Sequence, residues 1–319
     1  MKTLGLLTSG GDAPGMNAAL RAVVRAAIYR GLRVSGFERG YLGLMNNEAL
    51  PLTSRSVSGI VNVGGTMLKT ARCDEMKTRN GLQKAAAVLH DNLLDGLVVI
   101  GGDGSLTGAD QLQKISGLPV IGIPSTIDND VAGTDVTIGF DTAVNTALTE
   151  IDKIRDTATS HERLFIVVVM GRTRGFIALE VGLGSGAEII LVPEIRYDPC
   201  SIADEMARAR ESGKTSSIIV MSEGAGDPSL LAEELTERAG YDVRMTVLGH
   251  VQRGGPPSAD DRVLASLYGV AAVNLFLKGA RRNFVGMKGG KLVHPKLSTA
   301  RRMKKLDVRL WRAAKILSR

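Results

Sequence analysis

Short apolar runs alternate along the chain with longer segments whose apolar residues recur at helical spacing. The runs LGLLT (residues 4–8), DGLVVIGG (95–102) and LPVIGIP (118–124) are more apolar than strands of a half-exposed sheet. The segment at 17–31 is predicted to be a helix, and its apolar face holds Leu20, Val23, Val24, Ala27 and Ile28. These patterns predict β-α units around a covered parallel sheet.

The alternation continues into the second half of the chain. Strand patterns recur over 163–171, 187–194, 216–224 and 242–250, with helical stretches between them and a long helical pattern over 261–279. Repeated β-α units predict parallel sheets with helices on both faces. A length of 319 residues is enough for two lobes, each with its own core.

Composition fits an ordinary globular protein, with 44% hydrophobic and 23% charged residues. No signal-peptide pattern is found at the start, and no apolar run approaches the ~20 residues of a membrane helix. Cys73 and Cys200 form no metal or disulfide spacing. We therefore expect a cytoplasmic protein that does not associate with membranes.

Positive charge is concentrated at the C-terminus. Residues 281–319 hold 13 Lys or Arg and one acid, so this tail carries +12 and the remainder −5. A basic tail can bind nucleic acid, but we favour the solvated face of a C-terminal helix that docks on the body. Its apolar side is predicted to consist of Met303, Leu306, Leu310, Ala313 and Leu317.

Two glycine-rich loops follow predicted strands, where ligands bind in parallel α/β folds. The loop TSGGDAPGMN places Gly11 at the start of a helix, which suits a phosphate, although glycine pairs also serve plain turns. In GGDGS a single carboxylate, Asp103, stands among small residues. A lone carboxylate fits a phosphate site when Mg²⁺ lies between them, and otherwise Asp103 caps the next helix.

The stretch PSTIDND follows the next strand, so Asp128 is expected beside Asp103 at one sheet edge. One carboxylate can hold a metal while the other accepts a proton from a hydroxyl, as phosphoryl transfer to an alcohol requires. Thr126 can bond a transferring phosphoryl oxygen. The alternative is an Asx-type turn without chemistry.

Cationic residues also gather at strand ends. Arg163 stands at a strand start, Arg172 just after a strand end, and Arg244, His250 and Arg253 around another strand. Arginine presents a bidentate fork that fits phosphate. The residues together indicate a kinase-like enzyme with a nucleotide–Mg²⁺ site and an acceptor that carries its own phosphate.

Taken together, these stretches resemble one family. LTSGGDAPGMNAA, GGDGS, TIDND, SHER, MGR, LGHVQRGG and DRVLAS stand in the order and spacing of bacterial ATP-dependent 6-phosphofructokinases, up to about residue 280. The resemblance implies two similar three-layer α/β lobes with mostly parallel sheets, and an active site in the cleft between them. The lobes would be residues 1–139 with 252–302, for nucleotide, and 140–251 with 303–319, for sugar phosphate.

The resemblance also implies a role for each matching residue. Asp128 would be the general base on the 1-hydroxyl of fructose 6-phosphate, and Asp103 the Mg²⁺ ligand. The ATP-binding positions would be Gly11, Arg72, Cys73, Gly102, Asp103, Gly104 and Ser105. The substrate-binding positions would be Thr126, Asp128, Arg163, Met170, Gly171, Arg172, Glu223, Arg244, His250 and Arg253. The catalytic positions would be Asp128, Arg172, Thr126, Gly11 and Arg72, with the two arginines stabilising charge on the transferred group.

Oligomeric state and regulation follow from the same resemblance. Arg163 and Arg244 match arginines that reach into the neighbouring subunit's site, which implies a homotetramer with shared sites. An effector site for ADP or phosphoenolpyruvate would involve Arg21, Arg25, Arg155, Gly186, Glu188 and Lys214. Ser54 and Gly59 replace residues usual in that site, so allosteric control is expected with altered strength.

Several alternatives are weighed against this interpretation. A pyrophosphate-dependent relative would carry Asp at position 104 and Lys at position 125, where this chain has Gly104 and Ser125. Lipid and NAD kinases share a GGDG-type loop but lack the pairing of TIDND with LGHVQRGG. A Rossmann oxidoreductase needs G-x-G-x-x-G, and the first loop reads G-G-D-A-P-G. A catalytically inactive regulatory subunit is disfavoured because Asp103, Asp128 and Arg172 are all in place.

Overall fold

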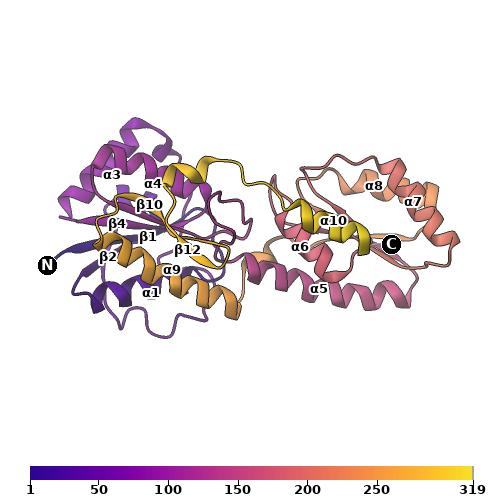
Figure 1. Ribbon diagram of the computed structural model, residues 1–319, viewed down its shortest axis with the longest axis horizontal. Coiled ribbons are helices and arrows are strands. Elements are labelled where there is room, and N and C mark those ends of the chain that lie inside the picture. The colour runs from indigo at the N-terminus through magenta and orange to yellow at the C-terminus, as the bar shows by residue number, and fades with distance from the viewer. Residues whose placement is uncertain (318–319) are drawn as a thin grey trace. The chain divides into compact units, whose positions relative to one another are not determined.

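The computed structural model describes residues 1–317, which form two compact units (Figure 1). Unit 1 comprises Met1–Thr142 and Arg253–Lys304, and unit 2 comprises Ala143–Gln252 and the chain from Lys305 onward. The chain therefore leaves unit 1, builds most of unit 2, and returns to complete each unit in turn.

Unit 1 is built on a six-stranded sheet in the order β10-β5-β4-β1-β2-β3, parallel except for the β2–β3 pair. Its strands are β1 (Thr3–Ser9), β2 (Arg33–Phe37), β3 (Ala49–Leu52), β4 (Gly96–Gly101), β5 (Val120–Pro124) and β10 (Arg282–Phe284). A separate antiparallel pair consists of β11 (Gly286–Lys288) and β12 (Lys291–Val293). The strands predicted over 4–8, 95–102 and 118–124 are thus confirmed as β1, β4 and β5.

Helices cover both faces of this sheet (Figure 1). The helices of unit 1 are α1 (Met16–Tyr29), α2 (Gly40–Met45), η1 (Asp74–Lys77), α3 (Arg79–Asp91), α4 (Asp103–Ser116), α9 (Ala259–Leu277) and η3 (Leu297–Arg301). α1 packs on α9, while α3, α4 and η3 pack together. Since β4 and β5 are buried along their whole length, both faces need a helical layer, as the apolar runs predicted.

Unit 2 has a four-stranded parallel sheet in the order β7-β8-β6-β9. Its strands are β6 (Leu164–Val169), β7 (Ile189–Leu191), β8 (Ser217–Ser222) and β9 (Val243–Val247). Its helices are α5 (Phe140–Ser160, which begins in unit 1), α6 (Phe176–Ser185), α7 (Pro199–Glu211), α8 (Pro228–Ala239), η2 (Gly249–Arg253) and α10 (Val308–Leu317). The expected α/β class with mostly parallel sheets is confirmed.

The C-terminal helix differs from the prediction at both ends. α10 begins at Val308, not Met303, which is 69% exposed and pairs with Val131 in an isolated bridge. Leu317 is 72% exposed, whereas Ala314 is buried. α10 packs on α6, so the predicted docking on the body is confirmed with a different inner face. Met303 and Leu317 have helical spacing in the sequence, but Met303 lies in an extended segment, so the two do not share a helix face.

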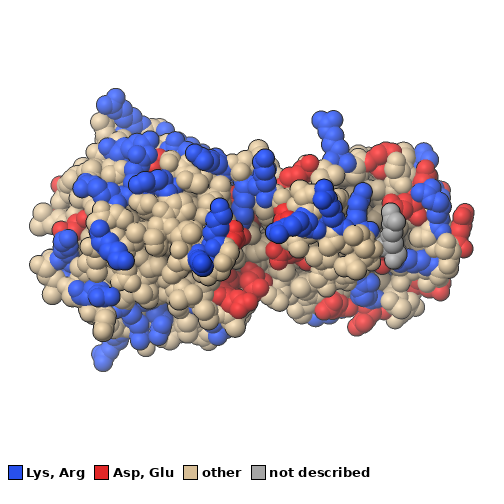
Figure 2. All heavy atoms as spheres, viewed as in Figure 1, with Lys and Arg blue, Asp and Glu red and all other residues tan. Residues whose placement is uncertain are grey.

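Basic residues of this segment remain at the surface. Arg301, Arg302, Lys305, Arg309 and Arg312 are exposed. Figure 2 shows Lys and Arg side chains scattered among uncharged surface and acids on the face it displays. No helix within residues 1–317 is both long and apolar enough to cross a membrane.

Candidate active site

Three neighbouring strands of unit 1 end side by side. In the parallel register Ser9 of β1 pairs with Gly101 of β4, and Gly101 pairs with Pro124 of β5. Beyond the strand, Ser125 N donates to Gly101 O at 3.0 Å. The loops that carry Gly11, Asp103 and Asp128 therefore leave the sheet at one edge, as the sequence predicted.

Glycines let these three loops approach each other. A Cβ on Gly10, whose φ is 91°, would lie 3.0 Å from Ser105 Oγ, and a Cβ on Gly102 would lie 3.4 Å from Thr126 Cβ. A side chain at position 10 would be strained by its positive φ and crowd Ser105, and one at position 102 would contact Thr126. Gly104 differs, because a Cβ there would meet nothing within 4 Å. Open space beside Gly104 is therefore available to a ligand.

The two carboxylates of this edge have contrasting surroundings. Asp103 is the first residue of α4 and is partly exposed. Asp128 is 3% exposed, and its N–H donates to Thr126 Oγ1 at 3.2 Å. This bond defines a turn of the Ser/Thr type, closed by the Thr126 hydroxyl, whereas the alternative expected from the sequence was an Asx-type turn. Buried and exposed carboxylates at one strand edge suit different chemical roles.

The surroundings of Asp103 fit Mg²⁺ in the presence of a phosphate. Mg²⁺ in kinases takes one or two carboxylates and completes its shell with water and substrate phosphate oxygens. Asp103 supplies one partly exposed carboxylate at a helix N-terminus, beside the open space at Gly104. Within residues 1–317 no group of three or more His, Cys, Asp or Glu is placed to hold a metal by itself. A Mg²⁺ ion at Asp103 would take its other ligands from water and phosphate oxygens.

The segment before η1 packs against the end of β1. Thr70 Oγ1 donates to Gly10 O at 2.7 Å, and Thr8 Oγ1 donates to Lys69 O at 2.8 Å. Arg72 follows and is exposed, whereas Cys73 packs partly buried on the core. Burial raises the pKa of the Cys73 thiol, which disfavours the reactive thiolate. Cys73 therefore contributes packing against the core and not a reactive thiolate.

Arg253 belongs to unit 1 and lies against the first glycine loop. Its Nη1 donates to Asp12 O at 3.3 Å, and a Cβ on Gly11 would come within 2.4 Å of that nitrogen. Gly11 therefore leaves the room that the guanidinium occupies. The sequence predicted Arg253 as a sugar-phosphate residue but did not predict its contact with the first glycine loop, because the two positions are far apart in the chain.

In unit 2, the residues after β6 and β8 form one loop cluster. Glu223 Oε1 accepts hydrogen bonds from Gly171 N (3.3 Å) and Arg172 N (2.7 Å). Gln252, fully buried, accepts from Met170 N at 3.4 Å. Arg172 has a φ of 54° and an exposed side chain. Glu223 thus shapes the loop that presents Arg172, a role the sequence did not suggest.

Two predicted arginines lie at the opposite edge of the same sheet. Arg163 immediately precedes β6, and Arg244 is the second residue of β9, paired with Phe165. Arg172 and His250 follow the carboxyl ends of these strands. Six residues of β-strand span roughly 20 Å, so one chain does not bring Arg163 and Arg244 into the cluster of Arg172.

Both of these arginines contact a residue that sequence reasoning missed. Asp242 Oδ2 accepts from Arg163 Nε at 2.7 Å and from Arg244 Nη2 at 3.2 Å. The hydrogen bond from Arg163, supported by the charge of Arg244, holds the pKa of the Asp242 carboxyl below its usual value. Asp242 carries no motif signal, since only the pairing of β6 with β9 brings it to Arg163.

The predicted effector residues of unit 2 are brought together. Arg155 Nη2 donates to Ser185 O at 2.7 Å and to Gly186 O at 3.3 Å. Two residues further, Glu188 bonds Lys214 Nζ at 3.0 Å and accepts from Ile218 N at 2.6 Å. Arg21 and Arg25 belong to unit 1, where they line a surface hollow with Tyr29, Ser266 and Asn274.

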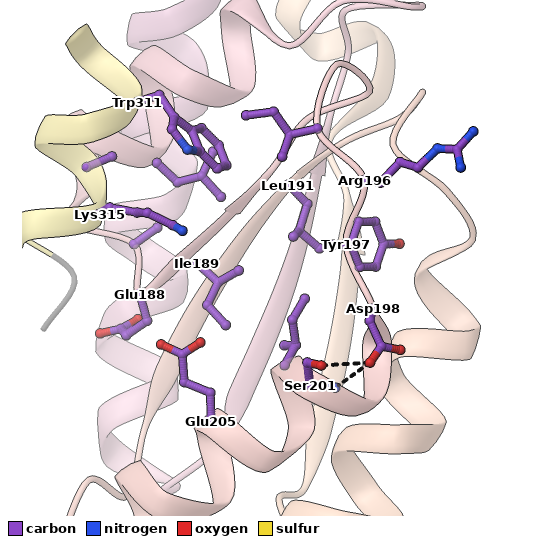
Figure 3. Close-up of a pocket in the computed structure, with 15 residues that line it drawn as sticks. Glu188, Ile189, Leu191, Arg196, Tyr197, Asp198, Ser201, Glu205, Trp311 and Lys315 are labelled. Carbon is purple, nitrogen blue, oxygen red and sulfur yellow. Dashed lines mark hydrogen bonds between the residues drawn. The ribbon is translucent and has the colours of Figure 1, made fainter. Parts of the chain in front are cut away.

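A cavity of about 450 Å³ adjoins Glu188 in unit 2 (Figure 3). Trp311 and Lys315 of α10 lie on one side of it, and Tyr197 and Asp198 of the loop before α7 lie on the other. None of the predicted catalytic residues lines it. Of the predicted effector residues, Glu188 lines this cavity.

Glycine loops with carboxylates at the ends of covered parallel strands, and an arginine loop on a second parallel sheet, are the architecture of an α/β phosphotransferase. Comparison with known proteins narrows this class. Residues 3–276 match the Phosphofructokinase family, and the chain belongs to that family.

Relatives and solved structures agree with this membership. The ATP-dependent 6-phosphofructokinases of Clostridioides difficile and Thermotoga neapolitana are 53% and 50% identical to this chain, each over 319 residues and the full length of both proteins. The structure of phosphofructokinase from Saccharomyces cerevisiae has a TM-score of 0.89 at 35% identity, covering 100% of this chain and 48% of that one. The pyrophosphate-dependent phosphofructokinase of Marinobacter aquaeolei shares the fold, with a TM-score of 0.85 at 23% identity, covering 97% of this chain and 86% of that one.

Proposed function

We propose that the protein transfers a phosphoryl group from Mg-ATP to the 1-hydroxyl of fructose 6-phosphate, which gives fructose 1,6-bisphosphate and ADP, the committed step of glycolysis. The observation that carries this proposal is the meeting of the Gly11 loop, Asp103 and Asp128 at one edge of the unit 1 sheet. Full-length relatives at about 50% identity bear the name ATP-dependent 6-phosphofructokinase. A glycolytic kinase of this kind works in the cytoplasm.

The nucleotide would bind over the two glycine loops. Main-chain N–H groups at the start of α4 attract phosphate oxygens, and the space beside Gly104 is open. The nucleotide-contacting positions are Gly11, Arg72, Cys73, Gly102, Asp103, Gly104 and Ser105. Asp103 would hold Mg²⁺, which when bound offsets the negative charge of the phosphate oxygens.

Asp128 would act as general base. Its carboxylate is nearly buried and follows the strand next to the one that Asp103 follows, and a carboxylate placed there can accept a proton from a hydroxyl. Thr126, which holds the Asp128 turn, would bond a transferring oxygen. Arg72 and Arg172, both exposed, would stabilise charge on the transferred group. Sugar-phosphate contacts would come from Met170, Gly171, Arg172, Glu223, His250 and Arg253.

ATP is favoured over pyrophosphate by two positions. An aspartate at 104 would project into the open space that a nucleotide needs. Ser125 is completely buried and its Oγ donates to Ile138 O at 3.4 Å, so a lysine there would not fit without moving the turn. The pyrophosphate-dependent neighbours are also more distant, at 22–23% identity.

We further propose a homotetramer with shared active sites. Arg163 and Arg244 lie at the amino edge of their sheet, where their side chains can reach the active site of a neighbouring copy of the chain. β9 is an edge strand with exposed Met245 (47%) and Val247 (67%). α9 carries a second exposed apolar stripe, formed by Val263, Leu267 and Val270 at helical spacing. Two separate apolar edges suit the two kinds of interface of a tetramer.

ADP or phosphoenolpyruvate would bind an effector site formed by the predicted effector residues of unit 1 and of unit 2. In unit 2, Arg155 donates to Gly186 O, and Lys214 forms an ion pair with Glu188 two residues further along the chain. In unit 1, Arg21 and Arg25 are one helical turn apart. In a tetramer the second group can come from another copy. Regulation would appear as a coupling between this site and sugar-phosphate binding.

One coupled assay tests the central proposal. Fructose 6-phosphate is offered with Mg-ATP, pyrophosphate or ADP as separate donors, and fructose 1,6-bisphosphate is measured. We expect turnover with ATP and little with the other two. Turnover with pyrophosphate alone would establish the alternative donor, and no turnover with any donor would reject the activity.

A further inference from the structure

Asp242 bonds two arginines, Arg163 and Arg244, at the amino edge of the unit 2 sheet. Neither arginine belongs to the loops that follow the carboxyl ends of its strands. It immediately precedes β9, and Arg163 immediately precedes β6, so the parallel pair brings them together. The main chain adds a bond from Leu164 N to Asp242 O at 3.2 Å. One side-chain oxygen of Asp242 then accepts from both Arg163 and Arg244.

The way these bonds are made leaves both guanidinium groups able to bind a ligand. Arg163 donates to Asp242 through Nε, and Arg244 donates through Nη2. Each guanidinium has five N–H donors, so most of them are not used by Asp242. Among the described residues, no other side-chain acceptor bonds either group. Arg163 therefore keeps its two terminal nitrogens for a bidentate contact with phosphate.

The shared carboxylate also changes the electrostatics of the pair. Two neighbouring guanidinium groups repel each other, and a carboxylate bonded to both offsets that repulsion. The three groups together carry a net charge of +1, which still attracts a phosphate dianion. The side chains of Arg163, Asp242 and Arg244 are 28%, 48% and 52% exposed, so solvent screens each pair and the effect is moderate.

We infer that Asp242 is a positioning residue, which holds Arg163 and Arg244 together so that both bind the phosphate of one sugar phosphate in a neighbouring copy of the chain. This inference rests on the proposed function. Asp242 does not touch the substrate. It raises the affinity for the sugar phosphate by orienting the two arginines, in the same way that residues hydrogen-bonded to metal ligands orient those ligands.

The test is steady-state kinetics of the full-length enzyme with Asp242→Asn. The Michaelis constant for fructose 6-phosphate is expected to rise about 2- to 10-fold, while kcat and the Michaelis constant for ATP stay near wild type. Asp242→Glu, which restores a carboxylate, should recover part of the loss. Glu237→Gln is the matched control, because Glu237 is an exposed acid of the same unit with no ion pair to an arginine among residues 1–317. Thermal melts of all variants check folding.

A double-mutant cycle separates positioning from a general effect. In an Arg163→Ala, Arg244→Ala background, adding Asp242→Asn should change nothing. An equal rise of the Michaelis constant in that background would overturn the inference. So would an unchanged constant in the single variant, or a lower one, which would mean that Asp242 competes with the substrate phosphate. If the wild type does not phosphorylate fructose 6-phosphate, the proposed function itself is wrong.

Discussion

Replacing Asp261 by asparagine should loosen the start of α5. Asp261 is completely buried. Its Oδ1 accepts from Gly139 N at 2.7 Å, and its Oδ2 accepts from Thr142 N at 2.9 Å and from Thr142 Oγ1. Since α5 begins at Phe140, one carboxylate from α9 satisfies donors of the first turn. Asparagine has only one acceptor oxygen, so its NH₂ group would face the N–H of Gly139 or of Thr142 and leave that donor without a partner.

The magnitude follows from these contacts. A buried donor left without a partner costs about 1–3 kcal/mol, and loss of negative charge at a helix N-terminus adds about 0.3–1 kcal/mol. Removing a buried charge offsets part of this cost. The net loss for Asp261→Asn should be about 1–3 kcal/mol, which lowers the melting temperature by about 2–12 °C for a unit of this size.

The assay is thermal unfolding with hydrogen exchange resolved at residues 139–145. Asp260→Asn is the matched control, because Asp260 precedes Asp261 on the same helix and is exposed. We expect faster exchange and a lower melting temperature only in the Asp261 variant. If the two variants melt together and exchange alike, the carboxylate does not hold α5 and the reasoning is refuted.

Asp261 also gives a pH dependence of defined sign. Burial raises the pKa of the Asp261 carboxyl, despite the hydrogen bonds from Thr142 and Gly139. The folded chain therefore takes up this proton at a higher pH than the unfolded chain, whose carboxyl titrates near ~3.9. The contribution of Asp261 to stability grows as pH falls through the folded pKa. The stability gap between wild type and Asp261→Asn should widen on acidification.

Three further predictions concern chemistry and stability. Asp128→Asn should lower kcat by ~10²–10⁴-fold with little change in substrate affinity; stopped-time product assays against Asp91→Asn, an exposed control, would expose an unaffected rate as the contrary result. Arg163→Ala should raise the Michaelis constant for fructose 6-phosphate without abolishing turnover, and an unchanged constant would speak against a contribution to a neighbour. Asp110 is buried yet bonded by Arg282 (2.6 Å) and Arg301 (3.3 Å); burial raises the pKa of its carboxyl, but these cations and Lys114 outweigh burial and lower it. Its stabilisation should therefore be present above pH ~3.9 and lost as pH falls through the folded pKa, whereas Asp110→Asn should melt lower at neutral pH and lose less on acidification.

The sequence predicted the strands and their ends because apolar runs mark buried parallel strands wherever they occur. Gly11, Asp103 and Asp128 could be placed at one edge from that rule alone, and the register of β1, β4 and β5 agrees. Each of the three residues follows the carboxyl end of its own strand, and parallel strands share one carboxyl edge whatever their order. The position of a strand end can be read from the residues around it, so this part of the site could be predicted.

Contacts set by pairing between distant segments could not be predicted. Asp242 meets Arg163 only because β9 lies beside β6, and Asp261 meets Thr142 only because α9 packs where α5 begins. Neither aspartate differs in the sequence from a surface acid. The start of α10 was misplaced for a related reason, since the bridge of Met303 to Val131 holds the preceding segment extended.

The return of the chain to unit 1 has a consequence for biosynthesis. β10 completes the sheet beside β5, and α9 covers α1, but both are translated after nearly all of unit 2. At about 5–20 residues per second, the first 142 residues wait on the order of ten seconds on the ribosome with the α1 face bare. We therefore expect unit 1 to complete its core only when synthesis is nearly finished, and chaperones that shield apolar surface to be able to bind the nascent chain until then.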